Sequence, residues 1–174
     1  MKIGILGGGA WGTALAQVAA RGDQPVTLWA REDDVVTSVN ERHKNASFLP
    51  GIPLSPSIRA TSDLADLADR DALLVVVPAQ FLRSVLAQLP AGNRALVLCA
   101  KGIEAGTQKL VAEVARELHP DAPVAVLSGP TFAHEVARGL PTAVTLACED
   151  EALRDALAER LGSATFRTYG SSDV

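Results

Sequence analysis

The chain has 174 residues, of which 48% are hydrophobic, 21% charged and 4% aromatic, and its formal net charge is −4. This length and composition suit one globular α/β domain and exclude a disordered chain. The acidic balance argues against a nucleic-acid partner, although a few well-placed Lys and Arg side chains can still bind a small anion.

The two cysteines and three histidines show no metal-binding pattern. Cys99 and Cys148 each lie inside an apolar run, as buried thiols of a protein in a reducing compartment do. No Cys or His pair has the spacing of a metal site. We therefore expect no bound metal. Glycines interrupt the apolar N-terminal segment, and no apolar run is long enough to span a membrane. We therefore also expect a cytoplasmic protein without a signal peptide or a membrane anchor.

Apolar runs alternate with amphipathic stretches along the chain. The pattern predicts strands at 2–6, 26–30, 58–61, 73–77, 95–100, 124–128, 142–147 and 164–168. It predicts helices at 10–21, 32–42, 79–89, 107–118, 131–138 and 151–161, and an irregular loop at 43–57. This β-α-β-α order predicts one α/β domain over residues 1–174, with a Rossmann-type, doubly wound, mainly parallel sheet and helices on both faces. The direction of the last strands stays open.

The first predicted strand leads directly into a G-x-G-x-x-G motif that opens the first helix. Gly7 would allow the tight turn, Gly9 would let the backbone approach a pyrophosphate, and Gly12 would let helix and strand pack closely. The free N–H groups and positive dipole of the helix N-terminus favour the anion. A purely structural glycine-rich turn is the alternative, but a position within a βαβ unit is the context in which this motif binds a dinucleotide.

The end of the second strand bears on the choice of cofactor. NAD-binding domains usually place an acidic residue there, whereas this chain has Arg31 followed by Glu32. A guanidinium at this position can pair with a 2′-phosphate, so we favour NADP and expect NAD to bind as well. A solvated arginine at a helix start is the other interpretation of Arg31.

Three further strand ends carry unusual residues, and ligands of such folds lie outside the carboxyl ends of the strands. Pro78 follows one strand and suits either a plain helix start or a ligand contact. Lys101 follows the next, where it is either a surface lysine or a cation that holds a nicotinamide amide or a substrate oxygen. Gly129 and Pro130 predict a sharp turn that aims the Thr131 hydroxyl and nearby N–H groups at the same crevice, unless these groups only cap the helix.

Six segments, in their order and spacing, resemble the bacterial NAD(P)-dependent sn-glycerol-3-phosphate dehydrogenases. They are GGGAWGTALA at 7–16, VTLWAR at 26–31, NASFLPGIPL at 45–54, VVVPAQFLR at 75–83, AKGIE at 100–104 and GPTFAHEVARGLPTAV at 129–144. The resemblance covers nearly the whole chain, and its last segment is far more specific than the glycine motif.

The resemblance implies which residues meet the ligands. Besides the glycine motif, it assigns cofactor contacts to Ala10, Trp11, Arg31, Phe48, Lys101 and Ala133. It assigns substrate contacts to Lys101, Gly129 and Thr131. Ala10 stands where a serine is frequent in the family, a difference that a backbone contact would survive.

The resemblance also implies a reaction, the interconversion of dihydroxyacetone phosphate and sn-glycerol 3-phosphate that feeds glycerophospholipid synthesis. In the family a proton-donating lysine and a phosphate-binding arginine follow on a helical domain, which we expect beyond Val174. We therefore expect this chain to be the coenzyme domain alone, without a catalytic residue of its own and inactive by itself. A homodimer of the full-length protein stays open.

Two alternatives remain at this point. The chain could be the coenzyme domain of a β-hydroxyacid dehydrogenase, which would share the glycine turn but has no reason to show the G-P-T-F-A segment. It could also be a free-standing Rossmann module that senses a nucleotide and regulates a partner.

Overall fold

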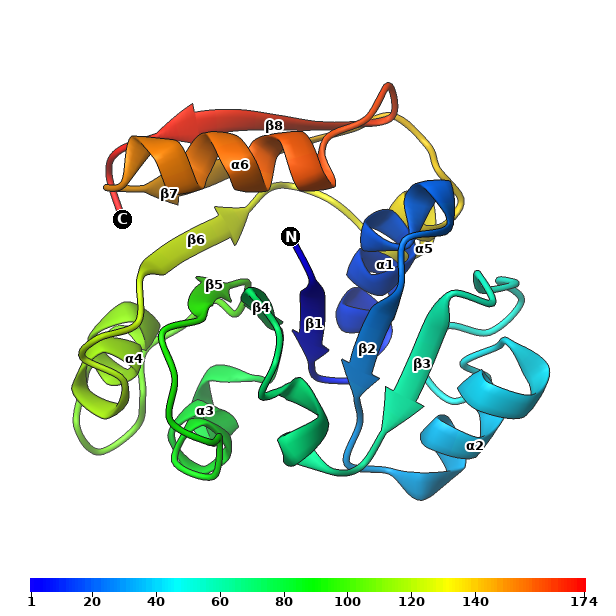
Figure 1. Ribbon diagram of the computed structural model, residues 1–174, viewed down its shortest axis with the longest axis horizontal. Coiled ribbons are helices and arrows are strands. Elements are labelled where there is room, and N and C mark those ends of the chain that lie inside the picture. Colours follow the sequence, from blue (N-terminus) through cyan, green and yellow to red (C-terminus); the bar gives the residue numbers. More distant parts are fainter.

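Eight strands form one sheet in the computed structural model, which describes residues 1–174 (Figure 1). They are β1 (Ile3–Leu6), β2 (Val26–Trp29), β3 (Ile58–Thr61), β4 (Ala72–Val75), β5 (Ala95–Leu98), β6 (Val124–Ser128), β7 (Thr142–Cys148) and β8 (Phe166–Ser171). Their spatial order is β3-β2-β1-β4-β5-β6-β7-β8. Only β6 and β7 pair antiparallel. The order of β1 to β6 is that of a doubly wound dinucleotide-binding sheet, which confirms the predicted fold class.

Helices cover both faces of this sheet. They are α1 (Ala10–Ala19), α2 (Asp33–Arg42), α3 (Ala79–Leu86), α4 (Val111–Leu118), α5 (Ala133–Ala137) and α6 (Glu151–Leu161). Two short 3₁₀ turns lie at Arg21–Asp23 and Leu64–Leu67. Helices α1, α5 and α6 lie on one face, and α3 and α4 on the other (Figure 1). The long loop between α2 and β3 packs against the face that α1 covers.

Strand side chains alternate between two apolar cores, one under each layer of helices. Ile3 and Ile5 belong to the core beneath α1, α5 and α6. Leu73 and Val75 belong to the core beneath α3 and α4. Every position of β1, β4 and β5 is buried, which is why these strands show nearly continuous hydrophobic runs in the sequence.

Several predicted boundaries are wrong by about a turn. The helix predicted at 107–118 begins only at Val111, because Gln108 adopts a φ of 59° that no α-helix contains. The first helix ends at Ala19 and passes into a 3₁₀ turn in which Gly22 has a φ of 66°. The last strand lies further along the chain than predicted, at Phe166–Ser171, and runs parallel to β7.

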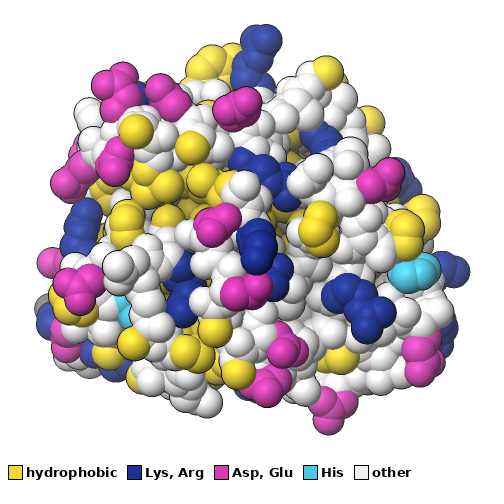
Figure 2. All heavy atoms as spheres, in the orientation of Figure 1, with side chains coloured by type: hydrophobic (Ala, Val, Ile, Leu, Met, Phe, Trp, Pro, Cys, Tyr) yellow, Lys and Arg dark blue, Asp and Glu magenta, His cyan; other side chains and the backbone are white.

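Three further features of the structure concern membrane spans, metal ligands and surface charge. No helix is both long and apolar enough to cross a membrane. No group of three or more His, Cys, Asp or Glu side chains is placed to hold a metal ion. Acidic and basic side chains are interspersed over the face seen in Figure 2, so this face carries no broad field of one sign.

The glycine turn between β1 and α1 is closely packed at every glycine except Gly9. Gly7 has a φ of 129°, which side-chain-bearing residues rarely adopt. A Cβ on Gly12 would lie 1.8 Å from the carbonyl oxygen of Gly7, so any side chain there would push α1 away from β1. At Gly9, by contrast, a Cβ would meet nothing within 4 Å. A Cβ on Gly8 would lie 2.4 Å from the Cβ of Ala30, so the turn is tight at Gly7, Gly8 and Gly12 and open at Gly9.

We expect Gly12→Ala to lower the free energy of unfolding by about 1–3 kcal/mol, the usual cost of forcing an extra group into packed structure. Gly9→Ala is the matched control and should change it by less than about 0.5 kcal/mol, because its methyl group points into open space. Urea denaturation followed by circular dichroism measures both. Equal midpoints for the two variants would contradict this account of the turn.

Candidate functional site

A cavity of about 440 Å³ opens at the carboxyl ends of β1, β2 and β4. One wall is the glycine turn from Gly7 to Gly12. Arg31, just after β2, and Phe48, from the loop after α2, form the second wall. Val77 and Phe81, at the end of β4 and in α3, form the third. The cavity thus lies where the strand order reverses on either side of β1, the usual ligand position in such sheets.

The glycine turn presents unsatisfied backbone donors to this cavity. The N–H groups of Gly9, Trp11 and Gly12 donate to no acceptor in the chain. No side chain caps the N-terminus of α1, where Gly9 is the N-cap residue. Free amides and the positive end of a ten-residue helix together favour an anion such as a phosphate.

Arg31 lies at the rim with most of its guanidinium exposed. Its Nη2 pairs with Oε1 of Glu32 at 3.1 Å, while the Arg31 side chain remains 75% exposed. An exposed ion pair of this kind contributes little stability. The guanidinium can therefore leave Glu32 for a more strongly charged group, such as a phosphate, at little cost.

A second cavity, of about 280 Å³, lies beside the first and shares Trp11 with it. Lys101, Gly129 and Thr131 line it, and the Nζ of Lys101 donates to the carbonyl oxygen of Gly129 at 3.4 Å. A Cβ on Gly129 would lie 2.9 Å from the carbonyl oxygen of Ala143, so the turn after β6 packs tightly against β7. The structure therefore brings together three residues that follow two different strands.

Cys99 also lines this second cavity but offers no reactive group. Its side chain is buried, and burial raises the pKa of its thiol far above the ordinary range. Cys148 is buried as well, and neither cysteine forms a disulfide, as predicted. A thiol that stays protonated is a poor nucleophile, so Cys99 acts here as a small apolar wall.

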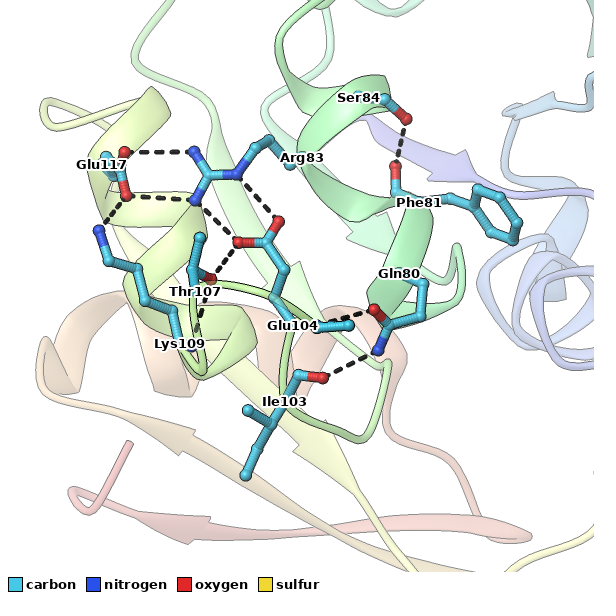
Figure 3. Close-up of polar contacts among 10 residues, drawn as sticks. Gln80, Phe81, Arg83, Ser84, Ile103, Glu104, Thr107, Lys109 and Glu117 are labelled. Atoms are coloured by element: carbon cyan, nitrogen blue, oxygen red, sulfur yellow. Dashed lines mark hydrogen bonds and ion pairs between the residues drawn. The ribbon is translucent and has the colours of Figure 1, made fainter.

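The loop that carries Lys101 is held from α3 by side chains that the sequence did not single out (Figure 3). Gln80 donates from Nε2 to the carbonyl oxygen of Ile103 at 2.9 Å, and its Oε1 accepts from the N–H of Ala105 at 2.9 Å. The amide side chain of Gln80 thus hydrogen-bonds the backbone on both sides of Glu104. This contact fixes the path of the backbone directly after Lys101.

Arg83 makes the second contact between α3 and this loop (Figure 3). Its Nε and Nη2 donate to the two carboxylate oxygens of Glu104 at 2.9 and 3.0 Å. It also donates to Glu117 of α4, which accepts from Lys109 too. A bidentate pair of this kind imposes geometry as well as charge. Hydrogen bonds from Arg83, and then from Thr107, lower the pKa of Glu104.

Comparison with known proteins identifies the family. Residues 2–154 match the family described as NAD-dependent glycerol-3-phosphate dehydrogenase N-terminus. The chain belongs to this family.

Its relatives include several longer proteins that are named glycerol-3-phosphate dehydrogenases. The chain is 60% identical over 173 residues to glycerol-3-phosphate dehydrogenase [NAD(P)+] 1 of Sphingopyxis alaskensis, a match that covers 99% of this chain and 52% of that protein. A crystal structure of glycerol-3-phosphate dehydrogenase from Coxiella burnetii superposes with a TM-score of 0.92 at 37% identity, over 99% of this chain and 54% of that one. The Plasmodium falciparum enzyme gives 0.90 at 27% identity, over 98% and 52%. The chain spans about half the length of the relatives it matches.

The family fits the residue clusters that the structure shows. Nearly every residue predicted to contact the cofactor or substrate lines one of the two cavities: Gly7, Gly9, Ala10, Trp11, Gly12, Arg31 and Phe48 line the first, and Trp11, Lys101, Gly129 and Thr131 the second. Ala133 lines neither, because it begins α5 and packs partly against the core. Its cofactor contact therefore stays a prediction.

Sequence reasoning missed two kinds of residue in this domain. Phe81 and Val85 line the first cavity from α3, and sequence reasoning assigned neither of them a ligand contact. Gln80, Arg83 and Glu104 hold the Lys101 loop, and only their places within the VVVPAQFLR and AKGIE segments connect them to the site. Contacts between residues more than twenty positions apart leave no periodic signal.

The Glu117 carboxylate should make folding stability depend on pH in an acidic window. Hydrogen bonds from Arg83 and then Lys109 lower its pKa from 4.5 to about 2. The ionised Glu117 carboxylate therefore stabilises the fold fully above pH 4.5, and this stabilisation is lost as the pH falls towards about 2. Glu117→Gln removes it, so parent and variant should differ in unfolding free energy at neutral pH and converge at low pH.

Urea denaturation at a series of pH values measures this difference. Glu159→Gln is the control, because Glu159 is an exposed glutamate of α6 that forms no ion pair. A difference between parent and Glu117→Gln that stayed constant down to pH 2 would show that the ion pairs do not cause it.

Proposed function

We propose that this chain is the coenzyme-binding part of an enzyme that interconverts dihydroxyacetone phosphate and sn-glycerol 3-phosphate with NADPH or NADH. The observation that carries the proposal is the cavity whose wall holds the unsatisfied amides of Gly9, Trp11 and Gly12 at the start of α1. Membership of the family supports the choice of reaction, and it favours this reading over a β-hydroxyacid dehydrogenase.

In this proposal the first cavity takes the dinucleotide. The amides of the turn bind the pyrophosphate, and the backbone of Ala10 and Trp11 contacts it. Phe48 supplies an apolar surface at the rim, where its side chain is 42% exposed. Arg31 meets the 2′-phosphate of NADP. When bound, the nicotinamide supplies a hydride, and the chain's own residues orient the two reactants.

The second cavity takes the nicotinamide end and the substrate. The Lys101 ammonium is placed to hold a carbonyl oxygen, while Gly129 and Thr131 offer backbone and hydroxyl groups beside it. Because Trp11 lines both cavities, a cofactor that extended past Trp11 from the first to the second would bring its nicotinamide near Lys101. Ala133 would contact the cofactor from the start of α5.

The proposal leaves the proton donor to the half of the relatives' length that this chain does not cover. Arg31 and Lys101 are the cations that line the two cavities, and both have binding roles here. Reduction of a ketone also needs a group within hydrogen-bond reach of the carbonyl oxygen that can give up a proton. We further propose a cytoplasmic enzyme acting on a small phosphorylated substrate, with no nucleic-acid or membrane partner; a homodimer of the full-length protein stays a prediction.

We expect the 174-residue chain to bind NADPH and not to oxidise it when dihydroxyacetone phosphate is added. Loss of a proton donor alone costs about 10²–10⁴-fold in rate, and loss of a phosphate clamp adds to this. Titration calorimetry measures binding, and absorbance at the NADPH band measures turnover. The longer protein should turn over dihydroxyacetone phosphate in preference to 3-hydroxyacids.

Gly9→Val is the control for the binding arm. Its side chain would occupy the open side of the turn without meeting the protein, so the fold should persist while NADPH binding is lost. Unchanged affinity in Gly9→Val would place the pyrophosphate elsewhere. Nucleotide binding without turnover by the longer protein would instead support a nucleotide-sensing module.

Arg31 should set the preference for NADPH over NADH. We expect Arg31→Ala to weaken NADPH binding by about 1–3 kcal/mol, or roughly 5- to 150-fold, because a charge-assisted contact with the 2′-phosphate is lost. NADH binding should change little. Calorimetry with both cofactors at fixed salt tests this, and equal affinities of the parent for NADPH and NADH would refute the assignment.

A further inference from the structure

Asn45 is a buried polar side chain that touches the glycine turn from behind. It lies in the loop after α2 and is completely buried. Its Nδ2 donates to the carbonyl oxygen of Gly8 at 2.8 Å and to Oγ1 of Thr13 at 2.7 Å. Its Oδ1 accepts from the N–H of Phe48 at 3.1 Å. One side chain therefore joins the turn, helix α1 and the loop that forms the rim of the first cavity.

The partners of Asn45 fix which way its amide points. A backbone N–H can only donate, so the Phe48 contact requires the oxygen of Asn45 on that side. The NH₂ group must then face Gly8, whose carbonyl can only accept. A buried amide that lacked these partners would be costly, so the arrangement has one favourable orientation.

The Gly8 carbonyl determines where the next N–H points. The peptide between Gly8 and Gly9 is trans and planar, so its C=O and N–H point in opposite directions. The oxygen points inward to Asn45, and the N–H of Gly9 therefore points outward. That N–H has no acceptor in the chain, and Gly9 lines the first cavity.

Glycine on both sides makes this peptide easy to rotate. Gly8 and Gly9 lack the Cβ that would restrict their dihedrals, so the backbone alone does not hold the orientation. A rotated peptide would place a carbonyl oxygen, with its partial negative charge, where an anion is to bind. The Thr13 hydroxyl gives only a weak second contact to the Gly8 oxygen, at 3.4 Å.

We propose that Asn45 is a positioning residue of the dinucleotide site, which holds the Gly8–Gly9 peptide with its N–H directed at the pyrophosphate. The proposal rests on the proposed binding of a dinucleotide. The Gly9 N–H is the group that the contact of Asn45 with Gly8 orients, so loss of Asn45 should mainly affect ligands that contain a pyrophosphate.

Two probes separate positioning from general loosening of the fold. ADP-ribose 2′-phosphate contains the pyrophosphate, whereas adenosine 2′-phosphate lacks it and retains the group expected to meet Arg31. We expect Asn45→Ala to weaken the binding of ADP-ribose 2′-phosphate by about tenfold or more, as the loss of a charge-assisted hydrogen bond does. The binding of adenosine 2′-phosphate should weaken by less than about threefold. Calorimetry on the parent chain with both ligands comes first, since failure of the parent to bind would overturn the proposed function itself.

Asn40→Ala is the matched control. Asn40 makes the same kind of contact elsewhere, since its side chain bridges both backbone groups of Ala60 at 2.9 Å, and it lines neither cavity. The Asn40→Ala variant should be less stable than the parent chain but should bind both probes with the same affinity. Equal weakening of both probes in Asn45→Ala, or full affinity for ADP-ribose 2′-phosphate, would overturn the positioning role.

A measurement on the parent chain covers the case in which Asn45→Ala does not fold. In amide NMR spectra, the Gly9 N–H should move strongly downfield when ADP-ribose 2′-phosphate is added and stay near its free position with adenosine 2′-phosphate. The Asn45 NH₂ protons should be protected from exchange in both states, because both of their acceptors are buried. A Gly9 amide that does not respond to the pyrophosphate would overturn the proposal.

Discussion

The site depends on the close approach of α1 to the end of β1. Gly12 lies so near the carbonyl oxygen of Gly7 that no side chain fits between them. This contact places the first turn of α1, with its unsatisfied amides, directly over the strand ends rather than a few ångströms beyond them. The parallel neighbours β2 and β4 then bring Arg31 and Val77 to the same edge, since parallel strands end together.

Local patterns in the sequence predicted most of this architecture. Buried strands leave apolar runs, and the glycine motif marks the turn because its constraints act within six residues. The same patterns could not predict the Gln80 and Arg83 contacts to the Lys101 loop, which join residues far apart in the chain. They also misplaced the start of α4, because the positive φ of Gln108 keeps this residue in the loop before the helix.

Arg31 and Arg83 show how one residue type serves two purposes. Arg83 is engaged by two carboxylates, which hydrogen-bond it and raise the pKa of its guanidinium, so it is committed to holding α3, α4 and the Lys101 loop together. Arg31 has one weak partner and an exposed side chain. A net charge of −4 therefore does not prevent anion binding, because what matters locally is which cations are already paired.

The two cavities are built to different degrees, and this bears on what the chain can do. The first has a wall of backbone amides that donate to no acceptor in the chain, as the proposed binding of a pyrophosphate requires. The second is smaller and contributes one ammonium, whose nearest acceptor is a carbonyl oxygen at 3.4 Å. A single loosely held cation can orient a carbonyl, but it cannot also donate the proton, bind the phosphate and exclude water. In the proposed function the groups that bind the cofactor therefore lie within this domain, whereas the chemistry requires further groups at the open side of the second cavity.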